Sequence, residues 1–373
     1  MPIYKMDGKK QSKQKYRVFV NYSDNHGKYH KKSKIVYGLD EAKECERNLA
    51  REISQAVPDR KMTVQQLYDE YIDVKKHEVR ITTLEKTKSI LKREIIPAFG
   101  ETRIDKLNIP ILQKWKNTVA EKKLAVKTKN NIYTEFRALL NYAVKMEYIS
   151  KNPLNGIGNF KKPEFETSEE KLHYYTAEQF KKYISVAKSH ISTISDYGYY
   201  VFFNIAFYTG MRKGEINALK WSDIDGDFIH VRRSVAQKVK GSSIIETPPK
   251  NKSSYRTLQM PQPLIEILTE YKNRCMQLKG FTDDYRVCGG ISCLSDTMIS
   301  NKNIEFATEA GLPIIRIHDF RHTHASLLAN DGINIQEIAR RLGHSKIETT
   351  WNTYAHLYPK EEERAVSILN KIK

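Results

Sequence analysis

The spacing of apolar side chains changes along the chain, and this change limits the folds that the sequence can adopt. Residues 16–22 and 28–37 alternate apolar and polar side chains and are rich in β-forming residues, which predicts two paired strands. A helix should follow, with Asp40 as its N-cap and its end near Ala56. Residues 1–58 are therefore predicted to form a small β-sheet with one helix behind it.

Helical spacing of apolar residues takes over after this first unit. Helix starts are predicted at Thr63, Thr82, Asn108 and Thr128. The first two have the form of a capping box, and the second helix should stop at Pro97 and Gly100. Trp115 and Phe136 fall on apolar helix faces and are expected in the core. Residues 62–155 are thus predicted to form a bundle of four helices.

A third unit should follow a linker. Residues 156–172 are rich in Pro, Gly and charge and lack periodicity, which is typical of a linker. Thr176 should then cap a helix, and residues 199–206 form an almost wholly apolar, central one. Two strands of a small sheet are predicted, at 228–233 and 255–260. The helical pattern returns from Pro263, so residues 173–373 are predicted to be a mixed α+β domain. The whole chain is expected to be multidomain and mainly α with small β-sheets.

The formal net charge of +19 suits a polyanionic partner. Residues 1–35 hold ten Lys or Arg against two Asp. Because these cations alternate with strand-forming residues, the predicted sheet is a candidate to lie in a DNA groove, and a solvated basic tail is the alternative. Lysines also gather in the connection before the fourth helix, where a solvated face is the alternative. The candidate DNA-contacting residues are Arg17, Lys28, Lys31, Lys32, Lys34, Lys127 and Lys129.

No stretch reaches the roughly 18 apolar residues that span a bilayer, and the N-terminus lacks the apolar run of a secretory signal. We therefore expect the protein to be located in the cytoplasm. Of the four cysteines, Cys288 and Cys293 lie close in sequence, but no second pair or histidine accompanies them. This pattern indicates that the four cysteines are free thiols and do not form a zinc site. The sequence also lacks a Walker loop and an acidic cluster of the two-metal kind, so no cofactor is expected.

The C-terminal half of the chain carries residues suited to metal-free chemistry on a phosphodiester. Such an ester resists attack because its anionic oxygens repel nucleophiles and its alkoxide leaves poorly, so an enzyme must supply positive charge, a nucleophile and a proton donor. Arg212 and Arg321 can each direct two N–H groups at phosphate oxygens. His318 would project to the same side of a helix start as Arg321. His344 follows Gly343, which lets backbone approach a phosphate closely, and either histidine can donate a hydrogen bond or help remove a proton.

These residues stand in segments that resemble the tyrosine recombinase (phage integrase) family. The segments are Thr209–Glu215, His318–Arg321, Leu342–Ser345 and Thr349–His356. The resemblance extends over essentially the whole chain. It implies an arm-type DNA-binding domain at residues 1–58, a helical core-binding (SAM-like) domain at 62–155 and a catalytic domain at 173–373.

The resemblance also implies individual roles. It makes Tyr354 the nucleophile, with Tyr358 as the one close competitor in sequence. It places a general-acid lysine in a hairpin at Lys250, where Lys252 is a rival. Together with the two arginines and two histidines above, these residues complete the expected catalytic set.

Three further polar residues lie close in sequence to that set. Glu215, three residues after Arg212, looks like the acidic partner that orients this arginine, the alternative being an ordinary surface pair. His322 and His324 crowd Arg321 and suggest a metal site. No HExxH pattern or carboxylate completes such a site, so we expect polar contacts or caps on the same helix.

By this resemblance, four protomers hold two DNA sites and exchange strands through a 3′-phosphotyrosyl bond and a Holliday junction, with neither ATP nor a metal ion. The implied function is integration and excision of a phage or conjugative element, with a DNA-bending host factor and an excision factor as further partners. One alternative is a chromosome- or plasmid-dimer resolving recombinase, although those lack an arm domain. A DNA-binding regulator with a silent site is another. A predicted helix at 361–372 either docks on a neighbouring protomer or packs on its own domain.

Overall fold

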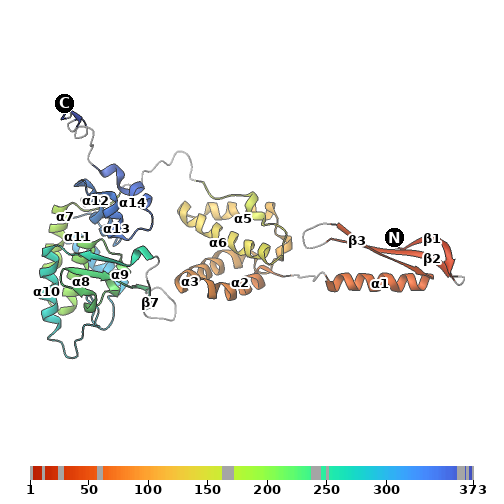
Figure 1. Cartoon of the computed structure of the whole chain (residues 1–373), viewed down its shortest axis with the longest axis horizontal. Coiled ribbons are helices and arrows are strands. Elements are labelled where there is room, and N and C mark those ends of the chain that lie inside the picture. Colours follow the sequence, from red (N-terminus) through yellow and green to blue (C-terminus); the bar gives the residue numbers. More distant parts are fainter. Residues whose placement is uncertain are drawn as a thin grey trace. The chain divides into compact units, whose positions relative to one another are not determined.

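The computed structural model describes residues 3–10, 13–23, 29–56, 62–161, 172–236, 245–248, 252–358, 366 and 369–371. The chain divides into two compact units, Met1–Thr167 and Ser168–Lys373 (Figure 1). Most described residues are helical, and the strands form small antiparallel sheets, as the sequence predicts. No helix in the described ranges is long and apolar enough to cross a membrane.

A three-stranded antiparallel sheet with one helix opens the first unit. Its elements are β1 (Ile3–Lys10), β2 (Lys13–Ser23), β3 (Tyr29–Tyr37) and α1 (Leu39–Ala56). The helix packs on one face of the sheet over Val18, Ala42 and Leu49. The predicted strands and helix are confirmed, but Asp40 is not the N-cap. Helix α1 begins at Leu39, and the Gly38 carbonyl accepts a hydrogen bond from the Ala42 backbone, so Asp40 lies in the first turn. Residues 24–28, between β2 and β3, lie outside the described residues. Strand β1 was not predicted, because Gly8 and a shift in its pairing with β2 interrupt the alternation of its side chains.

A helical bundle completes this unit. Its α-helices are α2 (Val64–Glu78), α3 (Ile81–Ile90), α4 (Ile96–Phe99), α5 (Ile109–Glu121) and α6 (Val126–Lys145). A π-helical turn, η1 (Leu91–Ile95), joins α3 to α4, and two 3-10 turns are η2 (Ile104–Lys106) and η3 (Pro153–Gly156). Trp115 and Phe136 pack edge to face in its core, which confirms the expectation that they are core residues.

Helix capping follows the sequence at two of the four starts predicted in the bundle. Thr63 forms a complete capping box, and the Asn108 side chain accepts a hydrogen bond from the backbone of α5. The start predicted at Thr128 is two residues late, because α6 begins at Val126 and the Ala125 carbonyl accepts hydrogen bonds from its first turn. The box predicted at Thr82 is wrong. The carbonyl of Arg80 already accepts hydrogen bonds from the backbone of Thr83 and Leu84, so α3 begins before Thr82 can act as a cap.

The second unit is built around α8, whose side chains are buried on nearly all sides. Its helices are α7 (Ala177–Ser189), α8 (Ile194–Thr209), α9 (Lys213–Ala218), α10 (Gln262–Cys275), α11 (Asp296–Glu309), α12 (Asp319–Asn330), α13 (Ile335–Leu342) and α14 (Ile347–Tyr354). Short 3-10 turns are η4 (Trp221–Asp223), η5 (Lys252–Ser254) and η6 (Ala355–Leu357). The capping box predicted at Thr176 is present.

Two small sheets lie in the second unit. One has the strand order β4 (Ile224–Asp225), β5 (Phe228–Val231) and β8 (Arg256–Gln259), and the other pairs β6 (Ser234–Ala236) with β7 (Ile245–Thr247). Strands β5 and β8 correspond to the two predicted segments, and Ile229 and Leu258 are fully buried where they pair. The sequence did not predict the other three strands, which are only two or three residues long.

Candidate active site

Helix α12 packs against α8, α13 and α14, and this packing brings together residues that are far apart in the sequence (Figure 1). His318 is the residue that precedes the first turn of α12, and Arg321 follows within that turn. Burial lowers the pKa of His318 and of His344 to about 4, and the nearby Arg321 and Arg212 add to this effect. Two arginines and two neutral histidines therefore share one electropositive site.

Arg321 joins three parts of the second unit. Its guanidinium is buried and donates hydrogen bonds to the carbonyl of Gly210 at 2.9 Å and to that of Leu342 at 2.5 Å. These carbonyls end α8 and α13, so Arg321 ties both helix ends to α12. Burial lowers its pKa to about 9, with Arg212 contributing, and Arg321 therefore stays charged at neutral pH.

Arg212 is held by Glu215 at the start of α9. The Glu215 carboxylate accepts hydrogen bonds from the Arg212 backbone, from Arg212 Nη1 and from Arg256 Nη2, each at 2.9 Å. Burial opposes ionisation of Glu215, but Arg256 and Arg212 outweigh it and lower its pKa. With its side chain 3% exposed, Glu215 is not an ordinary surface partner. One buried carboxylate thus orients Arg212, whose side chain remains 38% exposed.

His344 is positioned by a tight backbone turn. Gly343 ends α13 with φ +67°, and a Cβ there would lie 3.0 Å from the Ser253 carbonyl oxygen and 3.1 Å from Arg256. The glycine is thus required both by its conformation and by the space available. A hydrogen bond of 2.8 Å joins His344 Nδ1 to Thr350 Oγ1 on α14. This contact fixes the imidazole ring and leaves its Nε2 for another partner.

Tyr354, the last residue of α14, is 1% exposed. Its hydroxyl lies 2.7 Å from Nδ1 of His322, and burial raises the pKa of Tyr354 to about 12. The competing Tyr358 instead donates its hydroxyl to the Ile333 carbonyl at 2.5 Å, a structural contact on the neighbouring turn. Sequence reasoning gave His322 no part in the site. The available signal was its place directly after Arg321 and one helical turn after His318.

His324 has a different role. Its Nδ1 lies 2.9 Å from the Phe207 carbonyl, and a Cβ on Gly210 would lie 2.8 Å from its ring. It therefore packs α12 against the end of α8, in agreement with the expected polar contact. Burial, followed by the charge of Arg341, lowers its pKa to about 3.

The buried His324 makes stability sensitive to acid. A folded-state pKa below the unfolded value means that stability is present above about pH 6.5 and is lost as pH falls toward about 3. His324→Asn keeps a donor near the Nδ1 position but cannot take up a proton. Below pH 6.5, we expect the free energy of unfolding of the wild type to fall more steeply with decreasing pH than that of His324→Asn, by up to about 1.4 kcal/mol per pH unit. Thermal unfolding of both proteins at a series of pH values measures this difference. Parallel pH profiles for the two proteins would contradict this assignment.

The predicted general acid cannot be placed. Lys250 lies outside the described residues, and Lys252 begins η5 with its side chain also outside them. The strand leading to this segment is well held, since Glu246 on β7 accepts a hydrogen bond from Arg286 at 3.0 Å and lies 3.6 Å from Arg233. The predicted C-terminal helix at 361–372 lies outside the described residues, apart from Val366 and residues 369–371.

The N-terminal sheet separates its cations between two faces. In β3, Lys32 pairs with Val20 and its ammonium group contacts Glu52 of α1 at 2.9 Å. Lys31, one residue earlier, points to the opposite face and lies 3.9 Å from the centre of the Phe19 ring. Arg17 shares that open face with Phe19, whereas Lys34 shares the helix-bearing face with Lys32. Lys28 lies outside the described residues.

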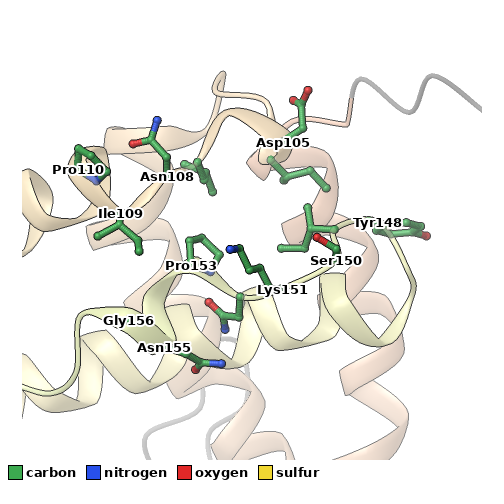
Figure 2. Close-up of a pocket in the computed structure, with 14 residues that line it drawn as sticks. Asp105, Asn108, Ile109, Pro110, Tyr148, Ser150, Lys151, Pro153, Asn155 and Gly156 are labelled. Carbon is green, nitrogen blue, oxygen red and sulfur yellow. The ribbon is translucent and has the colours of Figure 1, made fainter. Parts of the chain in front are cut away.

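In the bundle, Lys127 is exposed at the start of α6, and Lys129 donates to the Ala120 carbonyl at 2.6 Å. The bundle also contains a cavity of about 850 Å³ beside the start of α5 and the segment before η3 (Figure 2). Its Asn108 caps α5, and its Asn155 accepts a hydrogen bond from Arg137 at 2.9 Å. Because these amides serve the surrounding protein, we do not place the chemistry in this cavity.

Comparisons with known proteins agree with the geometry. Residues 173–361 match the model of the "Phage integrase family", and residues 63–120 match "Phage integrase, N-terminal SAM-like domain". The ICEBs1 integrase of Bacillus subtilis (strain 168) is 26% identical over 340 residues, which is 89% of this chain and 90% of the relative. A XerC-like tyrosine recombinase of Caldanaerobacter subterraneus subsp. tengcongensis is 30% identical over 286 residues, 70% of each chain.

Solved structures share the fold. The Tn1549 transposon integrase in complex with a circular intermediate DNA has a TM-score of 0.65 at 24% identity, covering 82% of this chain and 98% of the other. A lambda integrase dimer bound to a COC′ core site has a TM-score of 0.58 at 17% identity, with 94% of each chain covered. At these identities the likeness concerns the fold alone.

Proposed function

The chain belongs to the phage integrase family of tyrosine recombinases, and from that premise we propose that it cuts and rejoins DNA through a covalent bond to Tyr354. It is an enzyme that transfers DNA strands, of the integrase type. The observation that carries the proposal is the buried Tyr354 hydroxyl beside a site with two arginines and two neutral histidines. We propose integration and excision of a mobile element as the outcome.

The scissile phosphate binds between Arg212 and Arg321 in this proposal. Both side chains are charged and each is held by hydrogen bonds before DNA arrives. A preorganised donor of this kind contributes about 3 to 4 kcal/mol in the transition state. His318 and His344 are neutral at pH 7, so each can donate one N–H to a phosphate oxygen without adding charge.

The reaction then exchanges one ester for another. Tyr354 attacks the phosphorus, a 3′-phosphotyrosyl bond forms, and the 5′ oxygen leaves after taking a proton from Lys250 or from its rival, Lys252. The 5′ hydroxyl of a partner strand reverses the step. Because each ester is exchanged for another of similar energy, this series of reaction steps needs neither ATP nor a metal ion. Two successive exchanges, with a Holliday junction between them, recombine two duplexes held by four protomers.

DNA contacts outside the active site come from three parts of the chain in this proposal. The catalytic domain and the bundle, through Lys127 and Lys129, hold the core site. The N-terminal sheet binds a separate arm site through its open face, which carries Arg17, Phe19 and Lys31. We place the protein in the cytoplasm of a bacterial host, where that DNA lies, with a bending factor and an excision factor as further partners.

The two faces of β3 provide a matched test of arm binding. We expect Lys31→Ala to weaken binding to arm DNA and to reduce the slope of log K against log salt by about 0.9, the contribution of one phosphate contact. Lys32→Ala removes the same charge from the helix-bearing face, where Glu52 already pairs with it, and should change the slope less. Fluorescence anisotropy across a salt series measures both. Equal effects of the two substitutions would remove the open face as the binding surface.

Two other functions share parts of this description. A chromosome- or plasmid-dimer resolvase would use the same chemistry, but the sheet of residues 3–37 and the similarity to the ICEBs1 integrase favour an element integrase. A silent DNA-binding regulator would need no nucleophile. The buried hydroxyl, the oriented arginines and the neutral histidines favour an active site instead.

The proposal is tested by trapping the covalent intermediate. A duplex made from the junction that flanks this gene, nicked just downstream of the cleavage site, loses the short fragment that carries the free 5′ hydroxyl after cleavage, so the protein stays attached to the 3′ phosphate of the other fragment. We expect a denaturing gel to show a protein–DNA adduct, and peptide mapping to place the DNA on Tyr354. Binding of the same duplex without any adduct would reject the proposed activity on that junction, and an adduct on Tyr358 would reject the assignment of the nucleophile.

A further inference from the structure

We propose that His322 accepts the phenol proton of Tyr354 as the nucleophile attacks, a catalytic role that the sequence motifs do not give it. The inference rests on the proposed function of Tyr354. It follows from the 2.7 Å contact between Tyr354 Oη and His322 Nδ1 and from the burial of this pair.

The burial of Tyr354 creates the need for a base inside the protein. With the residue 1% exposed, bulk water cannot carry its proton away. Burial also raises its pKa to about 12, so the phenol is almost entirely protonated at neutral pH. Burial lowers the pKa of His322, which keeps that imidazole neutral and able to accept. The two shifts prepare a donor and an acceptor that already lie within hydrogen-bond distance.

The packing of α12 against α14 is suited to holding this pair. His322, Ala325 and Ala329 recur at the spacing of one helix face, and both alanines are fully buried in the cluster that contains Tyr354. Small side chains at these two positions let the tyrosine ring lie close to α12. The hydroxyl then reaches the ring of His322, whose centre lies 5.8 Å from that of Tyr354.

The other histidines of the site are engaged elsewhere. His344 uses Nδ1 for Thr350, and His324 uses Nδ1 for the Phe207 carbonyl. His318 packs edge to face with His322, at 5.3 Å between ring centres. This arrangement divides the tasks: His318 and His344 face the phosphate, and His322 serves the nucleophile.

In the proposed step, one proton moves from Tyr354 to His322. Neutral His322 carries its proton on Nε2, so the Tyr354 hydroxyl donates to Nδ1. As the phenol oxygen bonds to phosphorus, the O–H bond breaks and Nδ1 takes the proton, giving an imidazolium ion. The bond from phosphorus to the 5′ oxygen breaks, and that oxygen takes a proton from the general-acid lysine. When a 5′ hydroxyl attacks the phosphotyrosyl bond, His322 returns its proton to the departing phenol oxygen.

Two substitutions at position 322 separate proton transfer from simple positioning. His322→Asn places an amide near the Nδ1 position and can hold the Tyr354 hydroxyl, but it cannot take up a proton. His322→Ala leaves a space that free imidazole can enter. The measurement is the single-turnover rate of adduct formation on the nicked junction duplex, with a mobility-shift assay of the same duplex to show that each variant is folded.

We expect both variants to bind DNA as the wild type does and to cleave on the order of 10² to 10³ times more slowly. Added imidazole should restore cleavage by His322→Ala in proportion to its neutral fraction, and should not affect His322→Asn. Cleavage at or above the wild-type rate in both variants would overturn the inference, since His322 would then only restrain Tyr354. Slow cleavage that imidazole leaves unchanged in His322→Ala would also overturn proton transfer. Absence of an adduct with the wild-type protein would instead count against the proposed function itself.

Discussion

Tyr354→Phe should abolish the covalent protein–DNA adduct and all strand transfer while leaving DNA binding at wild-type strength. The substitution removes one oxygen atom from a buried ring, so the apolar contacts of Tyr354 with Ala325 and Leu342 remain. The loss of the hydrogen bond to His322 costs stability by about 1 kcal/mol, which a stable domain tolerates. A denaturing gel of the nicked junction duplex, beside a mobility-shift assay, measures both properties.

Tyr358→Phe is the matched control for this prediction. It also removes one hydroxyl from a nearby tyrosine, but that hydroxyl donates to the Ile333 carbonyl. We expect a slightly less stable protein that cleaves at the wild-type rate. If Tyr358→Phe lost the adduct and Tyr354→Phe kept it, the assignment of the nucleophile would be reversed.

Arg321→Ala should lower the cleavage rate by on the order of 10² to 10³, because a preorganised donor to the phosphate is lost. The same change leaves the carbonyls of Gly210 and Leu342 without their donor, at a cost of about 1 to 3 kcal/mol each. A lower thermal midpoint is therefore expected together with the slower chemistry. A loss of cleavage of only twofold would remove Arg321 from the phosphate site.

Arg321→Lys separates these two effects. Lysine keeps the positive charge but lacks the planar fork that can donate to both carbonyls and still face a ligand. We expect the thermal midpoint to recover more than the cleavage rate does. Single-turnover cleavage and thermal unfolding of wild type, Arg321→Ala and Arg321→Lys provide the comparison, and equal recovery of both properties would argue for a structural role alone.

The sequence predicted those parts of the fold that depend on local chemistry. The capping residues Thr63, Asn108 and Thr176 each act within their own first helical turn, so their patterns could be read directly. The cap at Thr82 failed because Arg80 starts the helix through its backbone carbonyl, for which the side chains give no signal. The π-helical turn after α3 was not predicted for the same reason.

The site residues show a similar division. Motif spacing identified Arg212, Arg321 and Tyr354 as candidates, since each stands in a segment that resembles the family. It gave no contact between His322 and Tyr354, because that contact depends on how α12 and α14 pack across more than thirty positions of sequence. Alternation placed Lys31 and Lys32 on opposite faces of a strand. It did not say which face α1 would cover, and this information is needed to choose between them as DNA contacts.

In the proposed reaction, the two hydrogen bonds of Arg321 make DNA cleavage depend on the folding of the whole catalytic unit. Its guanidinium reaches carbonyls at positions 210 and 342, so loss of either contact releases one wall of the phosphate site. A partly folded molecule, in which α12 has not docked on α8 and α13, has neither the oriented charge nor the held tyrosine. The orientation of Arg321 therefore depends on the docking of α12 against both α8 and α13, and not on α12 alone.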